Sequence, residues 1–270
     1  MTATETTTEL RPWLREGFRS LTPYLLAPQS ANLPDFMKSV FRATEIMRVL
    51  RPDGAIMHAE FKIGDSIVEM GENPPGENRL NKYPSRPTPL HVYVDDVDAT
   101  YARGLAAGAK SLGEPADHEY GERGAGLLDA AGNQWWIAKG FTPEHTLGLR
   151  SVNVYLHIQN TSGYIEFLKR AFGAREEMRH EMEGRIAHAR IWLGDTILEM
   201  GEAREPYGPM PCAFHFYVPD TDATYARALA AGATSVDAPA DAPYGDRAAT
   251  VTDPQGNQWF IATHLRNAAS

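Results

Sequence analysis

The sequence predicts an α+β protein built from four repeated units, each consisting of a strand, a helix and three more strands. The first observation is a long internal repeat: residues 98–111 read DATYARGLAAGAKS and residues 222–235 read DATYARALAAGATS. The match continues at a constant offset of 124 to residues 132–135 and 256–259, which both read GNQW. The second observation is the order of strand-like and helix-like periods around these repeats. The chain is therefore a tandem duplication.

The upstream part of each half also repeats, at offsets of 130 and 131. Arg19-Ser20 corresponds to Arg150-Ser151 there. A length of 270 residues agrees with two domains of similar size. We therefore divide the chain into an N-terminal tail (1–18), a first domain (19–140), a linker (141–149) and a second domain (150–266).

Composition excludes several classes of partner. The formal net charge is -9, the pI is near 5.5 and there is no Lys/Arg cluster, which argues against nucleic acid and anionic membranes. A single cysteine, Cys212, excludes an intrachain disulfide, and no apolar run approaches the ~20 residues of a membrane span. The Thr-rich start lacks the features of a signal peptide. We expect a soluble cytoplasmic protein with a frayed N-terminus and a small-molecule ligand.

The first unit begins with an apolar run at 21–26 that contains a proline, which is typical of a strand near a sheet edge. A helix follows, because Pro34 suits its first turn and Phe36, Val40 and Phe41 recur at helical spacing. Its copy in the second half spans 164–172 and ends at a glycine.

Three strands complete the first unit, at 45–51, 55–63 and 66–70. The last two are joined by Gly64-Asp65, a two-residue loop with glycine in its first position, as a tight hairpin requires. The second unit repeats the order: a strand at 91–94, a helix at 98–107, then strands around 111, at 124–128 and at 134–138. The loops at 73–89 and 203–213 either cover a site or are inert connectors.

The four βαβββ units, the Tyr-Gly-acid-Arg turns at 120–123 and 244–247, and the run DPQGNQW at 253–259 resemble the vicinal oxygen chelate superfamily. This is the glyoxalase, bleomycin-resistance and extradiol dioxygenase group, and the resemblance covers about 21–264. It implies two tandem glyoxalase-like domains in which pairs of units curl into cup-shaped mixed β-sheets, with helices outside and a ligand pocket inside. The group contains isomerases, lyases, dioxygenases, thiol transferases and drug-sequestering proteins, so the resemblance leaves the function open.

The resemblance places metal-ligand positions on the first strands (Thr22, His91, Asn153, His215) and on the last strands (Glu69, Trp136, Glu199, Phe260) of the units. Each site keeps one Glu and one His, whether units pair within a half or are exchanged between halves: Glu69 with His91 or His215, and Glu199 with His215 or His91. The extradiol triad expected at Asn153, His215 and Phe260 is also broken. Two ligands rarely hold a transition metal, so we expect no metal cofactor. The alternative is a divalent metal at Glu69 and His91, or at Glu199 and His215.

Hairpin geometry distinguishes the two halves. A two-residue loop at Gly64-Asp65 sets Glu60 directly opposite Glu69, with His58 one pair further on the same face. The two carboxylates then bind a cation, share a proton, or are relieved by solvent and Lys62. In the second half the same counting sets Arg190 opposite Glu199, beside His188. An Arg-Glu pair is favourable and like charges are not, so we expect different pockets.

Strand alternation then assigns a binding face. The candidate ligand-binding residues are Asn153, Tyr155, His157, Tyr217, Phe260, His264, His58, Glu60, Glu69, His91 and Trp136. Aromatic walls with a few polar groups suit a planar or amphipathic molecule. Because the first half has Gly140 where the second has His264, we expect the second half to carry the function. The arginines of the Tyr-Gly-acid-Arg turns recur in both halves, which indicates a structural role.

The first hypothesis for function is a metal-independent enzyme of the glyoxalase-like lyase and isomerase group, acting on a small oxygenated or carbonyl compound. His215 or His188 would be the general base, and Arg190, paired with Glu199, would hold a developing oxyanion. The second hypothesis is a non-catalytic protein that sequesters a small molecule. The third is a divalent-metal-dependent lyase, isomerase or dioxygenase. The sequence does not decide between enzyme and binder, and it agrees with a monomer or a homodimer.

Overall fold

All four predicted units are present in the computed structural model, which describes residues 11–73, 84, 86–142 and 146–265. Unit 1 contains β1 (Leu21–Pro28), the 3-10 helix η1 (Gln29–Ala31), α1 (Leu33–Phe41), β2 (Thr44–Leu50), β3 (Ile56–Ile63) and β4 (Ser66–Asn73). Unit 2 contains β5 (Pro89–Tyr93), α2 (Val97–Ala106), β6 (Lys110–His118), β7 (Glu122–Leu128) and β8 (Gln134–Gly140). The predicted order of elements is confirmed in both units.

The second half repeats this order. Unit 3 contains β9 (Val152–Ile158), α3 (Thr161–Phe172), β10 (Arg175–Met182), β11 (Arg185–Leu193) and β12 (Thr196–Glu202). Unit 4 contains β13 (Ala213–Tyr217), α4 (Thr221–Ala231), β14 (Thr234–Asp241), β15 (Asp246–Thr252) and β16 (Gln258–His264). Most of the predicted loop at 73–89 lies outside the described residues.

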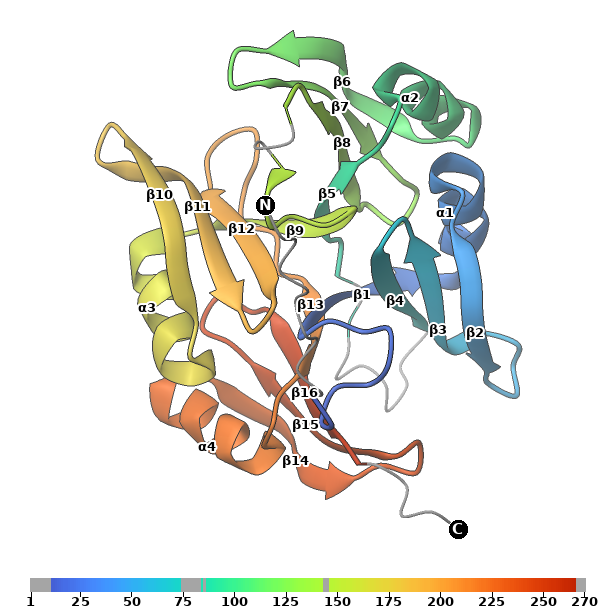
Figure 1. Cartoon of the computed structure of the whole chain (residues 1–270). Coiled ribbons are helices and arrows are strands. Elements are labelled where there is room, and N and C mark those ends of the chain that lie inside the picture. The colour runs from blue at the N-terminus through green and yellow to red at the C-terminus, as the bar shows by residue number, and fades with distance from the viewer. Residues whose placement is uncertain (1–10, 74–83, 85, 143–145, 266–270) are drawn as a thin grey trace, which may run out of the picture.

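The strands form two eight-stranded sheets (Figure 1). Sheet 1 has the order β14-β15-β16-β13-β1-β4-β3-β2, and sheet 2 has the order β10-β11-β12-β9-β5-β8-β7-β6. Each sheet mixes parallel pairs, such as β1 with β4, and antiparallel pairs, such as β3 with β4. The predicted α+β class with mixed sheets is confirmed.

Each sheet takes one unit from each half of the chain. β1 pairs antiparallel with β13, so units 1 and 4 share sheet 1, and β5 pairs antiparallel with β9, so units 2 and 3 share sheet 2. Of the two pairings that the sequence left open, the structure has the exchange between halves. Neither 19–140 nor 150–266 therefore builds a sheet by itself.

Two hairpin turns hold the halves together. Asp65, in the turn between β3 and β4, accepts a hydrogen bond from the backbone N–H of Ser151 at 2.8 Å. The equivalent Asp195 accepts one from Ser20 at 2.8 Å. Gly64 has φ 57°, and a Cβ there would lie 2.0 Å from Ser151 Oγ, so glycine also permits the close approach. The repeated Arg-Ser pair before β1 and β9 is thus part of the contact between halves.

The helices lie outside the sheets, with α1 beside α2 and α3 beside α4 (Figure 1). The core beneath them contains the tryptophans of both GNQW repeats, Trp135 and Trp259, which are fully buried. Their indole N–H groups donate to Asp129 at 2.8 Å and to Asp253 at 2.9 Å. The repeated motif therefore satisfies buried polar atoms of the core rather than contributing to a ligand site.

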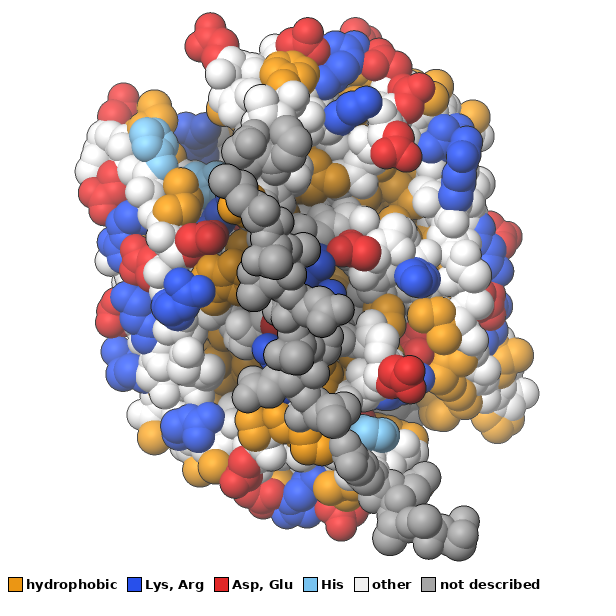
Figure 2. Space-filling view, viewed as in Figure 1, with side chains coloured by type: hydrophobic (Ala, Val, Ile, Leu, Met, Phe, Trp, Pro, Cys, Tyr) orange, Lys and Arg blue, Asp and Glu red, His pale blue; other side chains and the backbone are white. Residues whose placement is uncertain are grey.

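The surface seen in Figure 2 agrees with the absence of a Lys/Arg cluster in the sequence. Acidic and basic side chains are interspersed over the face seen in Figure 2. No helix among the described residues is both long enough and apolar enough to cross a membrane.

Candidate functional site

A cavity of about 840 Å³ lies on the inner face of sheet 2. All eight strands of the sheet contribute to its lining, so the sheet curls around the space as a cup. The aromatic part of the lining is Tyr93, Tyr120, Trp136, Tyr155 and Tyr207, and the polar part includes His91, Glu122, His157, His188, Arg190 and Glu199. We call this space the sheet 2 cavity. Residues from both halves of the chain line this cavity.

Glu199 on β12 is the centre of a charged cluster at the cavity wall, and it is 0% exposed. Arg190 lies directly opposite on β11, as predicted, with its Nε 3.4 Å from Oε1 of Glu199. His188 Nε2 lies 3.3 Å from the same oxygen. His91, from β5 of the other half, places Nδ1 3.1 Å from Oε2. One buried carboxylate thus has three basic partners.

These contacts decide the protonation of the cluster. Burial alone would raise the pKa of Glu199, but the contacts with His188 and His91 outweigh it, so this pKa is lowered. Burial lowers the pKa of His91, but the hydrogen bond and charge of Glu199 outweigh that effect, so the pKa is raised. Glu199 is therefore ionised at neutral pH, and its charge favours the protonated form of His91.

Three buried polar atoms in the cavity have no hydrogen-bond partner within the described part of the chain: the Tyr93 hydroxyl, Nε2 of His157 and Nε2 of His188. His188 Nε2 still lies within ion-pair distance of Glu199. Burial raises the pKa of Tyr93, so its O–H remains a donor. Burial also lowers the pKa of His157 to about 4, so its ring is neutral. Tyr207 stacks on His157 at 5.6 Å between ring centroids. The loop at 203–213 therefore covers the site.

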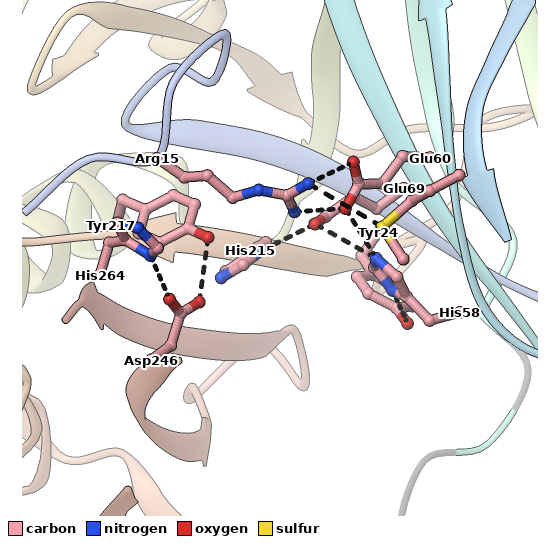
Figure 3. A network of polar contacts seen from close by, with 10 residues as sticks. Arg15, Tyr24, His58, Glu60, Glu69, His215, Tyr217, Asp246 and His264 are labelled. Carbon is pink, nitrogen blue, oxygen red and sulfur yellow. Dashed lines mark hydrogen bonds and ion pairs between the residues drawn. The ribbon is translucent and has the colours of Figure 1, made fainter. Parts of the chain in front are cut away.

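Sheet 1 carries a second cluster on its equivalent strands (Figure 3). Glu60 lies directly opposite Glu69, as the hairpin predicted. His215 Nδ1 is 2.9 Å from both carboxylate oxygens of Glu69. His58 Nε2 is 3.1 Å from Glu60, and the Tyr24 hydroxyl is 3.0 Å from His58 Nδ1. We call these residues the sheet 1 cluster. Of the residues described, His58, Glu60 and Glu69 form the group whose ligand atoms all lie within 4.8 Å, as metal binding requires.

Arg15 supplies the cation of the sheet 1 cluster. Its guanidinium contacts both oxygens of Glu60, through Nη1 to Oε1 and through Nη2 to Oε2, the latter at 3.0 Å (Figure 3). Phe18 follows in the same segment and is only 6% exposed. Residues 13, 14 and 18 pack on sheet 1. The Thr-rich start for which fraying is expected, residues 1–10, lies outside the described residues. Arg15 and His58 thus contact Glu60, and His215 contacts Glu69.

The two sheets treat equivalent tyrosines differently. In sheet 1 the Tyr217 hydroxyl donates to Asp246 at 3.0 Å, and His264 Nδ1 lies 2.8 Å from the same carboxylate. In sheet 2 the residue that faces Glu122 is Gly140, where sheet 1 has His264 facing Asp246. Only sheet 2 leaves the tyrosine hydroxyl, that of Tyr93, free to bind a ligand.

The predicted site residues are divided between the sheets. His91, Trp136, Tyr155, His157, His188, Arg190 and Glu199 line the sheet 2 cavity. His58, Glu60, Glu69, His215, Tyr217, Phe260 and His264 belong to sheet 1, where the Phe260 ring packs on Tyr24 with centroids 5.0 Å apart. The exchange of units separates His215 and His264 from Glu199, so these candidate residues of the second half do not share one site.

The same exchange decides between the two sets of Glu-His pairs that the sequence left open. Glu69 contacts His215 and Glu199 contacts His91, so the pairs Glu69 with His91 and Glu199 with His215 are not formed. Asn153 does not line the cavity either. Its Oδ1 accepts from the Arg150 backbone N–H at 2.9 Å and its Nδ2 donates to the Arg150 carbonyl at 2.7 Å. This side chain holds the turn before β9.

Several site residues were not predicted. Tyr93 stands two positions after His91, and the alternation that placed Tyr217 beside His215 would have placed it as well. Glu122 and its equivalent are the acids of the repeated Tyr-Gly-acid-Arg turns, of which only the arginines were considered. Nothing in the sequence around Arg15 indicates its role.

The turn arginines have structural partners, as predicted. Arg123 contacts Asp98 on α2, with Nε 2.7 Å from the carboxylate. Arg247 makes the equivalent contact with Asp222 on α4. Both arginines join a β-hairpin to a helix at the surface, and neither lines the sheet 2 cavity.

Comparisons with known proteins agree with this fold. The family model of the Glyoxalase/Bleomycin resistance protein/Dioxygenase superfamily matches residues 31–137 and 155–261. An uncharacterized protein of Mycobacterium bovis is 31% identical over 125 residues, which are 44% of this chain and 82% of that protein. An uncharacterized protein of Mycobacterium tuberculosis is also 31% identical over 125 residues, which are 44% of this chain and 74% of that protein. Glyoxalase I from Zea mays is similar in structure, with a TM-score of 0.67 at 16% identity over 90% of this chain and 92% of that chain.

Proposed function

Because this chain belongs to the glyoxalase, bleomycin resistance protein and dioxygenase superfamily, we propose that its sheet 2 cavity binds a small oxygenated or carbonyl compound and acts on it without a metal. One observation carries the proposal. The Tyr93 hydroxyl and the His157 Nε2 are buried without hydrogen-bond partners among the described residues, in an aromatic cavity beside a charged cluster. An unsatisfied buried polar group costs about 1–3 kcal/mol, which a ligand oxygen or N–H group would recover.

The chemistry follows from the positions of the polar groups. His188 is 32% exposed and lies against Glu199, which orients the imidazole and supports its positive charge after it takes a proton. Tyr93 donates a hydrogen bond to a ligand oxygen, and Arg190 stabilises negative charge that develops on that oxygen. His188 is therefore the proposed general base, and the predicted role of His215 is not proposed for this cavity.

The donor set of the cavity supports chemistry without a metal. Of its four positions equivalent to metal ligands, Trp136 has no ligand atom and Asn153 is held by its own turn. His91 and Glu199 remain, and they contact each other. Among the described residues, the group whose three ligand atoms lie close enough together to hold a metal is in sheet 1, where Arg15 contacts Glu60.

Ligand binding with matched tyrosine variants tests the proposal. A panel of small carbonyl and phenolic compounds is screened by thermal shift, and the affinity of each hit is measured by calorimetry. Tyr93→Phe should weaken binding about tenfold, since one hydrogen bond to the ligand is lost. Tyr217→Phe, the equivalent change in sheet 1, should leave the affinity unchanged. Weaker binding by Tyr217→Phe with no effect of Tyr93→Phe would place the ligand outside the sheet 2 cavity.

A non-catalytic binding protein is the second candidate, and one observation favours it. Glu199 is surrounded by basic partners and has a lowered pKa, so the carboxylate itself is a weak base. Mass spectrometry of a bound hit after long incubation separates the two functions. A ligand recovered unchanged identifies a binder. A product whose formation is lost in His188→Gln, with binding retained, identifies the enzyme.

A further inference from the structure

The inner face of sheet 1 is filled by the chain's own N-terminal segment, residues 11–20. Phe18 packs on Tyr217, with ring centroids 5.7 Å apart, and on His215 at 6.4 Å. The Trp13 carbonyl accepts a hydrogen bond from the His264 backbone N–H at 2.9 Å. This segment thus covers the face of sheet 1 that is equivalent to the cavity-forming face of sheet 2.

Arg15 is the part of the segment that reaches the buried acids. Glu60 is 0% exposed and faces Glu69 directly across the hairpin. Two carboxylates in this arrangement repel each other unless a cation lies between or beside them. The Arg15 guanidinium meets Glu60 with two nitrogens on two oxygens, which is the geometry of a planar, forked cation.

The surroundings of the guanidinium also suit a planar cation. The Arg15 Cζ lies 4.7 Å from the centroid of the Phe18 ring, and Nη2 lies 3.9 Å from the Met47 sulfur. An aromatic face and a polarisable sulfur both favour a weakly hydrated guanidinium over a strongly hydrated ammonium. The Arg15 side chain is 35% exposed, so it enters from the rim of the sheet and is not part of the core.

From these contacts we infer that the inner face of sheet 1 is a binding site for a guanidinium group, which the chain occupies with its own Arg15. The N-terminal segment closes this site to external ligands, and the sheet 2 cavity remains open. The inference does not depend on the function proposed for that cavity, because the two faces belong to different sheets.

Chemical rescue in the full chain tests the inference. Arg15→Ala leaves Glu60 and Glu69 with one cationic partner fewer than before, so the melting temperature should fall by about 5 °C. Methylguanidinium should restore most of this loss in the variant and leave the wild type unchanged. Methylammonium at the same concentration should restore less, since it lacks the fork.

Matched variants keep the result interpretable. Arg19 lies in the same segment as Arg15 and contacts Asp195 at the surface. The Arg19→Ala variant should show no rescue by methylguanidinium. Arg15→Ala combined with Glu60→Gln should also lose the rescue. If the Arg15→Ala variant does not fold, the Arg15→Lys variant replaces it in the assay. Lysine keeps the positive charge but lacks the two-nitrogen fork of the guanidinium. Equal stabilisation of all variants by methylguanidinium, or none, overturns the inference. Stabilisation of Arg15→Ala by Ni²⁺ without any effect of methylguanidinium also overturns it, because the site then belongs to a metal.

Discussion

Replacing Glu199 by glutamine removes the one negative charge that three basic side chains of the sheet 2 cavity share. Glutamine keeps the size of the side chain and can still accept a hydrogen bond, so the loss is mainly electrostatic. Removing one partner of a buried ion pair costs about 3–5 kcal/mol. Since His188 and Arg190 retain access to solvent, at 32% and 17% of the side chain, we expect the lower end, about 3 kcal/mol of unfolding free energy.

The loss should depend on pH in a defined direction. His91 has a raised pKa in the folded state, so its contribution is present below about pH 6.5 and is lost as the pH rises through the raised value. Glu199 has a lowered pKa, so its contribution is present above about pH 4.3 and is lost as the pH falls. The Glu199→Gln deficit is therefore largest between about pH 4.5 and 6.5, and it should become smaller as the pH rises to 9.

Urea unfolding at pH 6 and pH 9 measures both quantities. Glu166→Gln is the matched control, because Glu166 forms an exposed pair with Lys169 at 2.8 Å and should cost less than about 1 kcal/mol. A Glu199→Gln deficit as small as that of the control, or one that grows from pH 6 to pH 9, would refute the assignment of a charged His91-Glu199 pair.

Three further predictions concern single residues. The pKa of His157 is lowered to about 4 by burial, so the stability of the wild type should decrease as the pH falls from about 6.5 to 4, and His157→Phe should remove about 1–3 kcal/mol of that decrease in urea unfolding. Arg247→Ala breaks surface contacts only, and calorimetry should give an unchanged ligand affinity; a large loss would make this turn part of the site. Asp253→Ala leaves the buried donors of Trp259 and Tyr164 without their acceptor, at about 1–3 kcal/mol for each, and an unfolding free energy equal to that of the wild type would contradict this role of the GNQW repeat.

The sequence was sufficient for the features that depend on neighbouring residues. The strands and helices of the four units follow from local periodicity and from glycine and proline positions. The hairpin loop at Gly64 fixed the pairing of Glu60 with Glu69, and its copy fixed Arg190 with Glu199, because a two-residue loop leaves a single register. The structural role of the turn arginines also followed, since both copies of the repeat retain them.

Only the tertiary structure decided which units share a sheet. β1 and β5 each pair along one edge through backbone hydrogen bonds, which look the same for any side chain, so nothing in the strand sequences states whether the partner comes from the same half. That pairing brings His91 to Glu199 and His215 to Glu69. The burial of Arg15 was equally invisible, because a single arginine in an irregular segment has no periodicity, and its partner Glu60 is 45 residues away in the chain. The residues that face each other within one hairpin could therefore be predicted from the sequence. The residues that join them from the other half of the chain were set by long-range backbone pairing.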